Sequence, residues 1–411
     1  MLKPLSKFNL SVFFQTQIFL LPVLLLFYQH NGLTTGDFFL FQGIFSLAAL
    51  LFEVPAGYIG DLFPKRNILI LSYVCFIARL ILWIFWAQYG YWIIFAGEIL
   101  YAMQKASFSG AADGYIFEYL KSEGRDRRMP KRYGKMNFCM SLGTALSSLI
   151  GAWCYQRVSE WSLARYQQDY GFVVLLCMEL ILNGMALVLI CRMPNLPVMA
   201  PVRKSLKEVY ARFFQIIGWT WKHPDIRYHI LYAGMMASVT LVFVWSFQPL
   251  MKSLAIPVAV YGAVYFLNHL FRALAGLLLD KIMRVFTMPR LGLTVFVLFA
   301  LSFGISVLMI YEQPLPMWIN LSYFGFLALT IGIQVAFTLA NVSRLHRFVP
   351  SDRRSTVSSV NTAVGRVFAG FFLILMKFLI DGCSLSVSLG ICFFVFLLGI
   401  FPLYRLWRVP D

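Results

Sequence analysis

Long apolar stretches recur along the whole chain of 411 residues, and short polar loops separate them. Most of these stretches hold about 20 residues, the length that an α-helix needs to cross the hydrocarbon core of a bilayer. Apolar types make up 60% of the chain and charged types only 13%, whereas soluble domains hold about 45–50% and about 25%. The chain cannot cover itself with polar surface, which excludes a soluble globular protein and a disordered one.

The apolar stretches predict an all-α membrane protein with twelve transmembrane helices. They are expected at 8–28, 37–60, 68–87, 91–119, 135–155, 171–192, 226–250, 258–279, 290–310, 316–344, 355–379 and 384–404. We expect the first span to be a retained helix and not a removed signal peptide, because no small-residue cleavage site follows it.

The net charge of +17 could suggest a nucleic-acid-binding protein, but the placement of the basic residues argues against that class. Lys and Arg cluster in every second loop, as they do in the cytoplasmic loops of membrane proteins. This predicts cytoplasmic N- and C-termini and a multi-pass protein of a bacterial inner membrane. The seven cysteines show no CxxC spacing, so no metal site and no disulfide framework is expected.

The longest hydrophilic stretch, 193–225, divides the spans six and six. We therefore predict a bundle at 1–192, a cytoplasmic linker at 193–225 and a second bundle at 226–411. Apolar residues of the linker repeat at helical spacing, at Leu206, Tyr210, Phe213, Ile217 and Trp221. This spacing favours an amphipathic helix on the membrane surface over a flexible linker.

The two halves share a pattern at the end of their second span. Gly57 and Asp61 precede the basic residues Lys65 and Arg66, and Gly276 and Asp280 lie at the same offset in the second half, followed by Arg284. A shared Gly-x-x-x-Asp before a basic loop indicates two pseudo-symmetric six-helix bundles, an architecture used by transporters.

The stretch FEVPAGYIGDLFPKRN (52–67) resembles the signature loop of the major facilitator superfamily, Gly-x-x-x-Asp-Arg-x-Gly-Arg-Arg. Gly57, Asp61, Lys65 and Arg66 fit this pattern, while Leu62 and Pro64 depart from it. Together with twelve spans and the 6+6 division, the resemblance covers essentially the whole chain. It implies two bundles that rock around a central substrate site.

The resemblance also implies a conformational gate at these loops. Gly57 would let its helix approach a neighbour closely, and Asp61 would face the start of the eleventh span. Asp113, with Glu118 as second choice, would pair with the basic loop, and Gly276, Asp280 and Arg284 would be the counterparts in the second half. The alternative is that the charges only hydrate a loop and set the topology.

Ionisable residues inside the spans are costly and usually mark a pathway. The cations Arg79, Lys105, Arg272, Arg366 and Lys377 lie within predicted spans. The resemblance implies that Arg79 and Glu179 are peripheral. The candidates for a substrate cavity are Gln15, Lys105, Trp245, His269, Arg272, Gln334 and Arg366, and those for proton coupling are Glu53 and Glu98. Pairing of Lys105 with Glu98 or Glu53 is the alternative to anion recognition.

These residues predict a secondary active transporter, proton-coupled, for a small organic anion or zwitterion, in a size range that reaches carboxylate-rich chelators. The expected partners are this small-molecule substrate and the lipid bilayer, with no nucleic acid, no cofactor and a monomeric state. A multidrug exporter for lipophilic cations and a non-transporting sensor with a transporter fold are the alternatives. No Walker motif supports ATP hydrolysis, and no catalytic constellation supports an enzyme.

Overall fold

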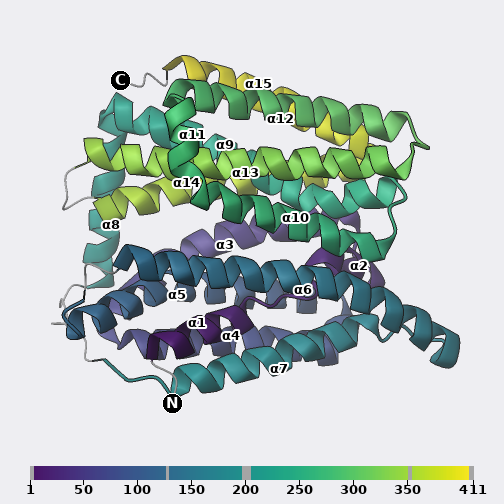
Figure 1. Cartoon of the computed structure of the whole chain (residues 1–411), viewed down its shortest axis with the longest axis horizontal. Coiled ribbons are helices and arrows are strands. Elements are labelled where there is room, and N and C mark those ends of the chain that lie inside the picture. The colour runs from purple at the N-terminus through teal and green to yellow at the C-terminus, as the bar shows by residue number, and fades with distance from the viewer. Residues whose placement is uncertain (1–3, 126–128, 197–204, 350–353, 407–411) are drawn as a thin grey trace. The chain divides into compact units, whose positions relative to one another are not determined.

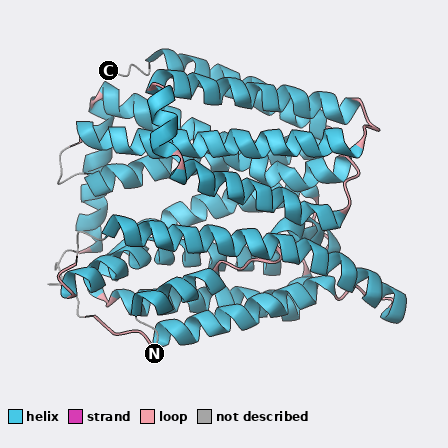
Figure 2. Cartoon of the chain, in the orientation of Figure 1, coloured by secondary structure: helices cyan, strands magenta, loops and turns pink. Residues whose placement is uncertain are grey.

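A computed structural model describes residues 4–125, 129–196, 205–349 and 354–406 of the chain. These residues form helices joined by short loops, and no strand occurs among them (Figures 1 and 2). The predicted all-α fold is confirmed. Nine of the described helices are long and apolar enough to cross a membrane, and shorter apolar segments lie at 21–30 and 385–400.

The chain divides into two compact units. Unit 1 comprises residues 1–33, 48–209 and 258–266, and unit 2 comprises 34–47, 210–257 and 267–411. The larger helices of unit 1 are α1 (Pro4–Gln15), α2 (Leu24–His30), α4 (Lys65–Trp86), α5 (Tyr91–Ser122), α6 (Met129–Tyr166) and α7 (Gly171–Cys191). The predicted division into bundles at 192 and 226 stays a prediction. The compact units differ from it, because unit 1 includes residues 258–266 and unit 2 includes residues 34–47.

Unit 2 is built mainly from the second half of the chain. Its helices are α9 (Pro224–Ser253), α12 (Met288–Tyr311), α13 (Met317–Phe348), α14 (Arg354–Gly382) and α15 (Leu385–Leu406), with the short α11 (Leu279–Val285). Helix α9 is the central element of this unit, because it packs against α12, α13, α14 and α15. Close packing against α14 is possible at Gly234, which lies against Val364 and Gly365.

Two long helices are shared between the units. The first part of α3 (Thr35–Leu62) belongs to unit 2, where Gly36 and Gly43 lie against α14 and Gly370 of α14 lies against Leu47. The first part of α10 (Val258–Leu277) belongs to unit 1, where Gly262 lies on the backbone of Ser148 and Leu149. Small residues at these places let helices approach to backbone contact.

The first span is not one continuous helix, in contrast to the prediction for 8–28. Helix α1 ends at Gln15, residues 16–20 are not helical, and a single 3₁₀ turn (Leu21–Val23) leads into α2. Pro22 contributes to the break, because proline lacks the N–H that would bond the carbonyl of Ile18 and its ring clashes with that turn. Proline alone is not sufficient, since α3 and α9 continue through Pro55 and Pro249. Gly143 and Gly151 of α6 make room for the exposed backbone of this break.

The fifth span is longer than expected. Helix α6 continues to Tyr166, eleven residues beyond the predicted end at 155, through a segment that we had expected to be a loop. Gln156 donates a hydrogen bond to Glu160 (2.7 Å), and Arg157 lies 3.8 Å from the same carboxylate. Side chains three and four residues apart support a helix in this way, so the polar end of the span remains helical.

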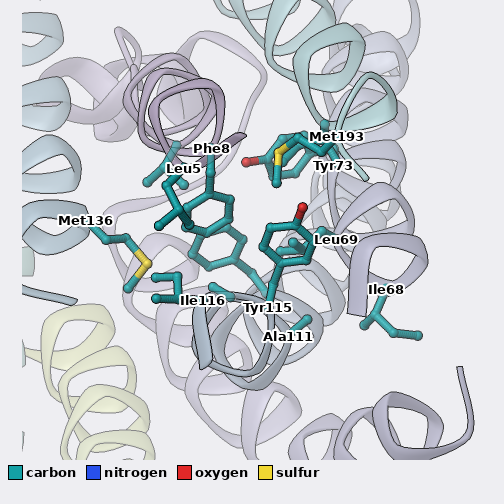
Figure 3. Close-up of a cluster of buried hydrophobic side chains, with 14 of the residues drawn as sticks. Leu5, Phe8, Ile68, Leu69, Tyr73, Ala111, Tyr115, Ile116, Met136 and Met193 are labelled. Carbon is teal, nitrogen blue, oxygen red and sulfur yellow. The ribbon is translucent and has the colours of Figure 1, made fainter. Parts of the chain in front are cut away.

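The core of unit 1 gathers aromatic and aliphatic side chains from α1, α4, α5 and α6. Figure 3 shows Tyr73 and Tyr115 beside Phe8, with Met193 over the ring of Tyr73. Phe8 and Tyr115 stack with ring centroids 5.8 Å apart. The hydroxyl of Tyr115 donates to the carbonyl of Pro194 (3.2 Å), so the chain leaving α7 is fastened to this core.

The predicted linker helix is present as α8 (Leu206–Lys222). Its side chains Leu206 and Phe213 lie outside the described residues, whereas Ile216 is buried with Ile226, Leu345 and Val360. Trp221 is exposed. The helix thus packs on the core of unit 2 through Ile216, and its contact with a membrane surface stays a prediction.

Gly151 is expected to be a position where even one added methyl group destabilises the protein. A Cβ there would lie 2.8–2.9 Å from backbone atoms of Phe19, which cannot move without disturbing the break in the first span. We expect Gly151→Ala to lower stability by about 1–3 kcal/mol, as overpacking does. The measurement is the melting temperature in detergent. The matched control is Gly184→Ala in α7, which meets no atom within 4 Å; equal losses in both variants would contradict the packing argument.

Candidate functional site

A buried ion pair lies inside unit 1, between α4 and α5. Arg79 donates from Nη2 to Oε1 of Glu98 at 3.3 Å, and both side chains are 3% exposed. The hydroxyl of Tyr28 in α2 donates to the same carboxylate oxygen at 2.8 Å. Glu98, predicted as a proton-coupling residue near Lys105, is therefore held by Arg79 and Tyr28. Pairing of Glu98 with Lys105 is not observed.

Aromatic rings surround the Arg79 guanidinium. Its central carbon lies 3.9 Å from the ring centroid of Trp83, 4.5 Å from that of Tyr101 and 5.4 Å from that of Phe76. Such contacts stabilise a desolvated cation. Arg79, expected to be peripheral, is thus enclosed in the interior of unit 1.

A second carboxylate, Glu179 of α7, lies next to the break in the first span. It is fully buried and accepts a hydrogen bond from the backbone N–H of Leu20 at 2.7 Å. Its other oxygen, Oε2, has no hydrogen-bond partner among the described residues. Glu179 was also expected to be peripheral; it instead caps a backbone group that the interrupted helix leaves without a helical partner.

The depths of these three residues agree. At 1.5 Å per residue, Arg79, Glu98 and Glu179 lie about 10–12 Å from the ends of their helices that face the same side of unit 1. Arg79 forms the ion pair with Glu98 and also interacts electrostatically with Glu179, so the three side chains form one charged cluster. Each uncompensated charge inside an apolar span costs about 2.5–3.5 kcal/mol on insertion scales. Two carboxylates and one guanidinium leave a negative charge uncompensated when all three are ionised.

Lys105 of α5 is a cation without a carboxylate partner among the described residues. Its side chain is half-buried, and its ammonium nitrogen lies 5.1 Å from the ring centroid of Tyr101. It is about 21 Å along the helix from Tyr91, inside a hydrocarbon layer of about 30 Å. Gln15 is buried in α1, and Glu53 is half-buried in α3.

Unit 2 contains a comparable cation in α10. Arg272 is exposed, although it lies about 21 Å along its helix from Val258, and the described residues offer it no ion pair. His269, one turn away, is half-buried, and the neighbouring Asn268 is buried. Arg272 thus has the chemistry to bind an anion with its planar fork of donors.

The other cavity candidates of unit 2 lie on three helices. Trp245 of α9 is half-buried and meets Phe38 edge-to-face, with ring centroids 5.7 Å apart. Gln334 of α13 is buried and donates to Thr338 (2.8 Å), and Arg366 of α14 is half-buried. Gln334 is therefore occupied within its own helix.

The predicted gate loop of the first half is fastened to helix ends. Lys65 donates to the carbonyl of Gly60 (2.5 Å), and Arg66 donates to the carbonyl of Met193 (2.9 Å). The aliphatic part of Lys65 lies against Gly114, beside Asp113. Cations at the ends of α3 and α7 satisfy the carbonyls that helices leave exposed there. The side chain of Asp61 lies outside the described residues, and Asp113 has no described hydrogen bond or ion pair.

The expected close approach at the gate glycines is not observed. At both Gly57 and Gly276, an added Cβ would meet no described atom within 4 Å. Asp280 and Arg284 are exposed on α11. In this conformation, no neighbouring helix among the described residues comes close to Gly57 or Gly276. The close helix contacts lie instead at the glycines where α3 meets α14 and where α10 meets α6.

Two polar clusters of unit 2 were missed by sequence reasoning. Lys377 of α14 bonds Asp37 at the start of α3 (2.9 Å) and Asp381 one turn away (2.6 Å). His229 of α9 lies 2.9 Å from the amide oxygen of Asn341 in α13, and both are buried. Two sequence features could have indicated the first cluster: a lysine within a predicted span, and its i,i+4 spacing to Asp381. The contact with Asp37 could not be predicted in this way, because Asp37 lies far from Lys377 in the sequence.

Comparisons with known proteins identify the fold. A family model described as the Major Facilitator Superfamily matches residues 8–373. Among solved structures, the nucleoside transporter NupG is 10% identical, with a TM-score of 0.75 and coverage of 100% of both chains. A POT family transporter in complex with 5-aminolevulinic acid is 13% identical, with a TM-score of 0.72, over 98% of this chain and 95% of the other.

A bacterial homolog of the human lysosomal transporter Spinster, in an inward-facing and occupied conformation, is 12% identical. Its TM-score is 0.69, over 99% of this chain and 97% of the other. Among the curated protein sequences, none matches this chain.

The Lys377 cluster is expected to contribute measurably to stability. Lys377→Met leaves the carboxylates of Asp37 and Asp381 close together without their cation, and we expect a loss of about 1–3 kcal/mol. The measurement is the melting temperature at neutral pH. The control is Arg157→Gln, whose ion pair with Glu160 is exposed on both sides (68% and 55%) and which should cost under about 1 kcal/mol. Equal melting temperatures for the two variants would refute the cluster's role.

Proposed function

Because the chain belongs to the major facilitator superfamily, we propose that it is a proton-coupled secondary active transporter for a small organic anion or zwitterion. Its two bundles would alternate between conformations that open the substrate site to either side of the membrane. The substrate class extends to carboxylate-rich chelators. The termini would lie in the cytoplasm, and the protein would act as a monomer in a bacterial inner membrane.

The charge of the substrate is inferred from Lys105 and Arg272. Each lies deep within a span, and neither has a carboxylate partner among the described residues. Cations are retained inside a membrane where they serve a pathway or a ligand. One carboxylate that could have neutralised Lys105, Glu98, is bound to Arg79 instead, which leaves Lys105 available to an anionic group of the substrate.

The similar solved structures are compatible with an anionic or zwitterionic substrate, but they do not single out this substrate class. One solved relative was captured with 5-aminolevulinic acid, a compound with one carboxyl and one amino group. Another is a nucleoside transporter, so the shared fold accepts substrates of different charge. The choice of an anion or zwitterion therefore depends on the cations of this chain.

Ligand binding tests this proposal. We expect mono-, di- or tricarboxylates or zwitterionic amino acids from a screened panel to raise the melting temperature of the purified protein. Uptake of the compounds that bind is then measured in proteoliposomes with an imposed pH gradient. Arg272→Gln and Lys105→Gln should each weaken binding by about 10–100-fold, because each removes a charged hydrogen bond of about 1.5–3 kcal/mol.

The matched control is Arg165→Gln, since Arg165 is exposed near the end of α6. It should bind the same compounds as the unaltered protein. Binding of lipophilic cations alone, or equal anion binding by all the variants, would contradict the proposed substrate class.

A further inference from the structure

The charged cluster of unit 1 has one more negative group than positive. Arg79 contributes one positive charge, and Glu98 and Glu179 contribute one negative charge each. All three side chains are buried, so bulk water does not screen the surplus. A single proton on one carboxylate makes the cluster neutral. Buried groups in hydrocarbon reach neutrality in this way more cheaply than by holding an unpaired charge.

The hydrogen bonds show which carboxylate would carry the proton. Glu98 accepts from the Arg79 guanidinium and from the Tyr28 hydroxyl, and a charged donor favours an ionised acceptor. Glu179 accepts from the uncharged backbone N–H groups of Leu20 and Phe19, and its Oε2 has no partner among the described residues. An added proton on Oε2 therefore displaces no observed donor.

We propose that Glu179 is a proton-binding site that links protonation to the interrupted first span. In this step a hydronium ion gives up a proton to Oε2: an O–H bond of hydronium breaks, an O–H bond to Oε2 forms, one water is released and the carboxylate becomes a neutral carboxyl. The charged group that acts on Glu179 is Arg79 from α4, and beyond this guanidinium lies Glu98 from α5, which accepts from Tyr28 of α2. Among the described residues of α1 and α6, no acidic or basic side chain interacts with Glu179.

The link to the first span is the hydrogen bond from Leu20. An ionised carboxylate binds a backbone N–H more strongly than a neutral carboxyl does. Proton binding at Glu179 therefore weakens the cap on the break at residues 16–20, and proton release strengthens it. Ile18 and Thr16 remain attached to α6, through Ser147 (3.0 Å) and Thr144 (3.2 Å), so the change is confined to the side of the break that faces α7.

Infrared spectroscopy of the full chain in lipid bilayers tests the site without a substrate. We expect a carbonyl-stretch band of a protonated carboxyl at neutral pH. Glu179→Gln should abolish the band, since Glu98 then pairs alone with Arg79, and the Gln side chain still offers an oxygen to Leu20. Arg79→Met should strengthen the band, because both carboxylates then need a proton. The exposed control Glu312→Gln should leave it unchanged.

One further variant separates the two carboxylates. Tyr28→Phe removes a donor from Glu98 and should leave the frequency of the band unchanged if Glu179 carries the proton; a shifted band would assign the proton to Glu98 and overturn the proposal. No band in the unaltered protein, or an unchanged band in Glu179→Gln, would also overturn it.

The role of this proton in transport rests on the proposed function, and proteoliposomes test it separately. Glu179→Gln should exchange substrate across the membrane but fail to accumulate it against a gradient with a pH difference imposed. Full accumulation by the variant would refute coupling through Glu179. If the protein binds and moves no anion, the proposed function fails, while the infrared result still decides on the protonation site.

Discussion

The interrupted first span depends on side chains that replace its missing backbone hydrogen bonds. Lipid offers no donor or acceptor, so an irregular backbone survives at membrane depth only where protein groups satisfy it. Glu179 binds the N–H of Leu20, Ser147 binds that of Ile18, and Thr144 binds the carbonyl of Thr16. These three contacts place a carboxylate deep in unit 1, and that carboxylate in turn requires a nearby cation or a proton.

The spans could be predicted from the sequence because hydrophobic length alone determines them. Most predicted ends lie within a few residues of the observed helices, and the main misses have local causes. Pro22 lies at the end of the break in the first span and disfavours its closure, and i,i+4 contacts such as Gln156 with Glu160 extend α6 beyond its apolar part. Both signals are present in the sequence, but a prediction based on the length of apolar stretches takes no account of them.

The partners of the charged residues could not be predicted in the same way. Arg79, Lys105, Glu53 and Glu98 permit several pairings at compatible depths, and the choice depends on how each helix is rotated about its axis. Helical periodicity is weak where a span is apolar on all sides. In the structure, Glu98 forms its ion pair with Arg79. Aromatic rings of α4 and α5 make cation–π contacts with the Arg79 guanidinium, and these contacts explain why Arg79 is the cation that is buried beside Glu98.

The two kinds of intramembrane cation in this chain have different consequences. Arg79 is enclosed by rings and a carboxylate, so its charge is compensated within the protein and its effect on function passes through the protonation of its neighbours. Lys105 and Arg272 have no such partner among the described residues, and under the proposed function an anionic substrate group would compensate them. A substrate anion and a proton at Glu179 would carry opposite charges, so moving both together would transfer less net charge across the membrane than moving the anion alone.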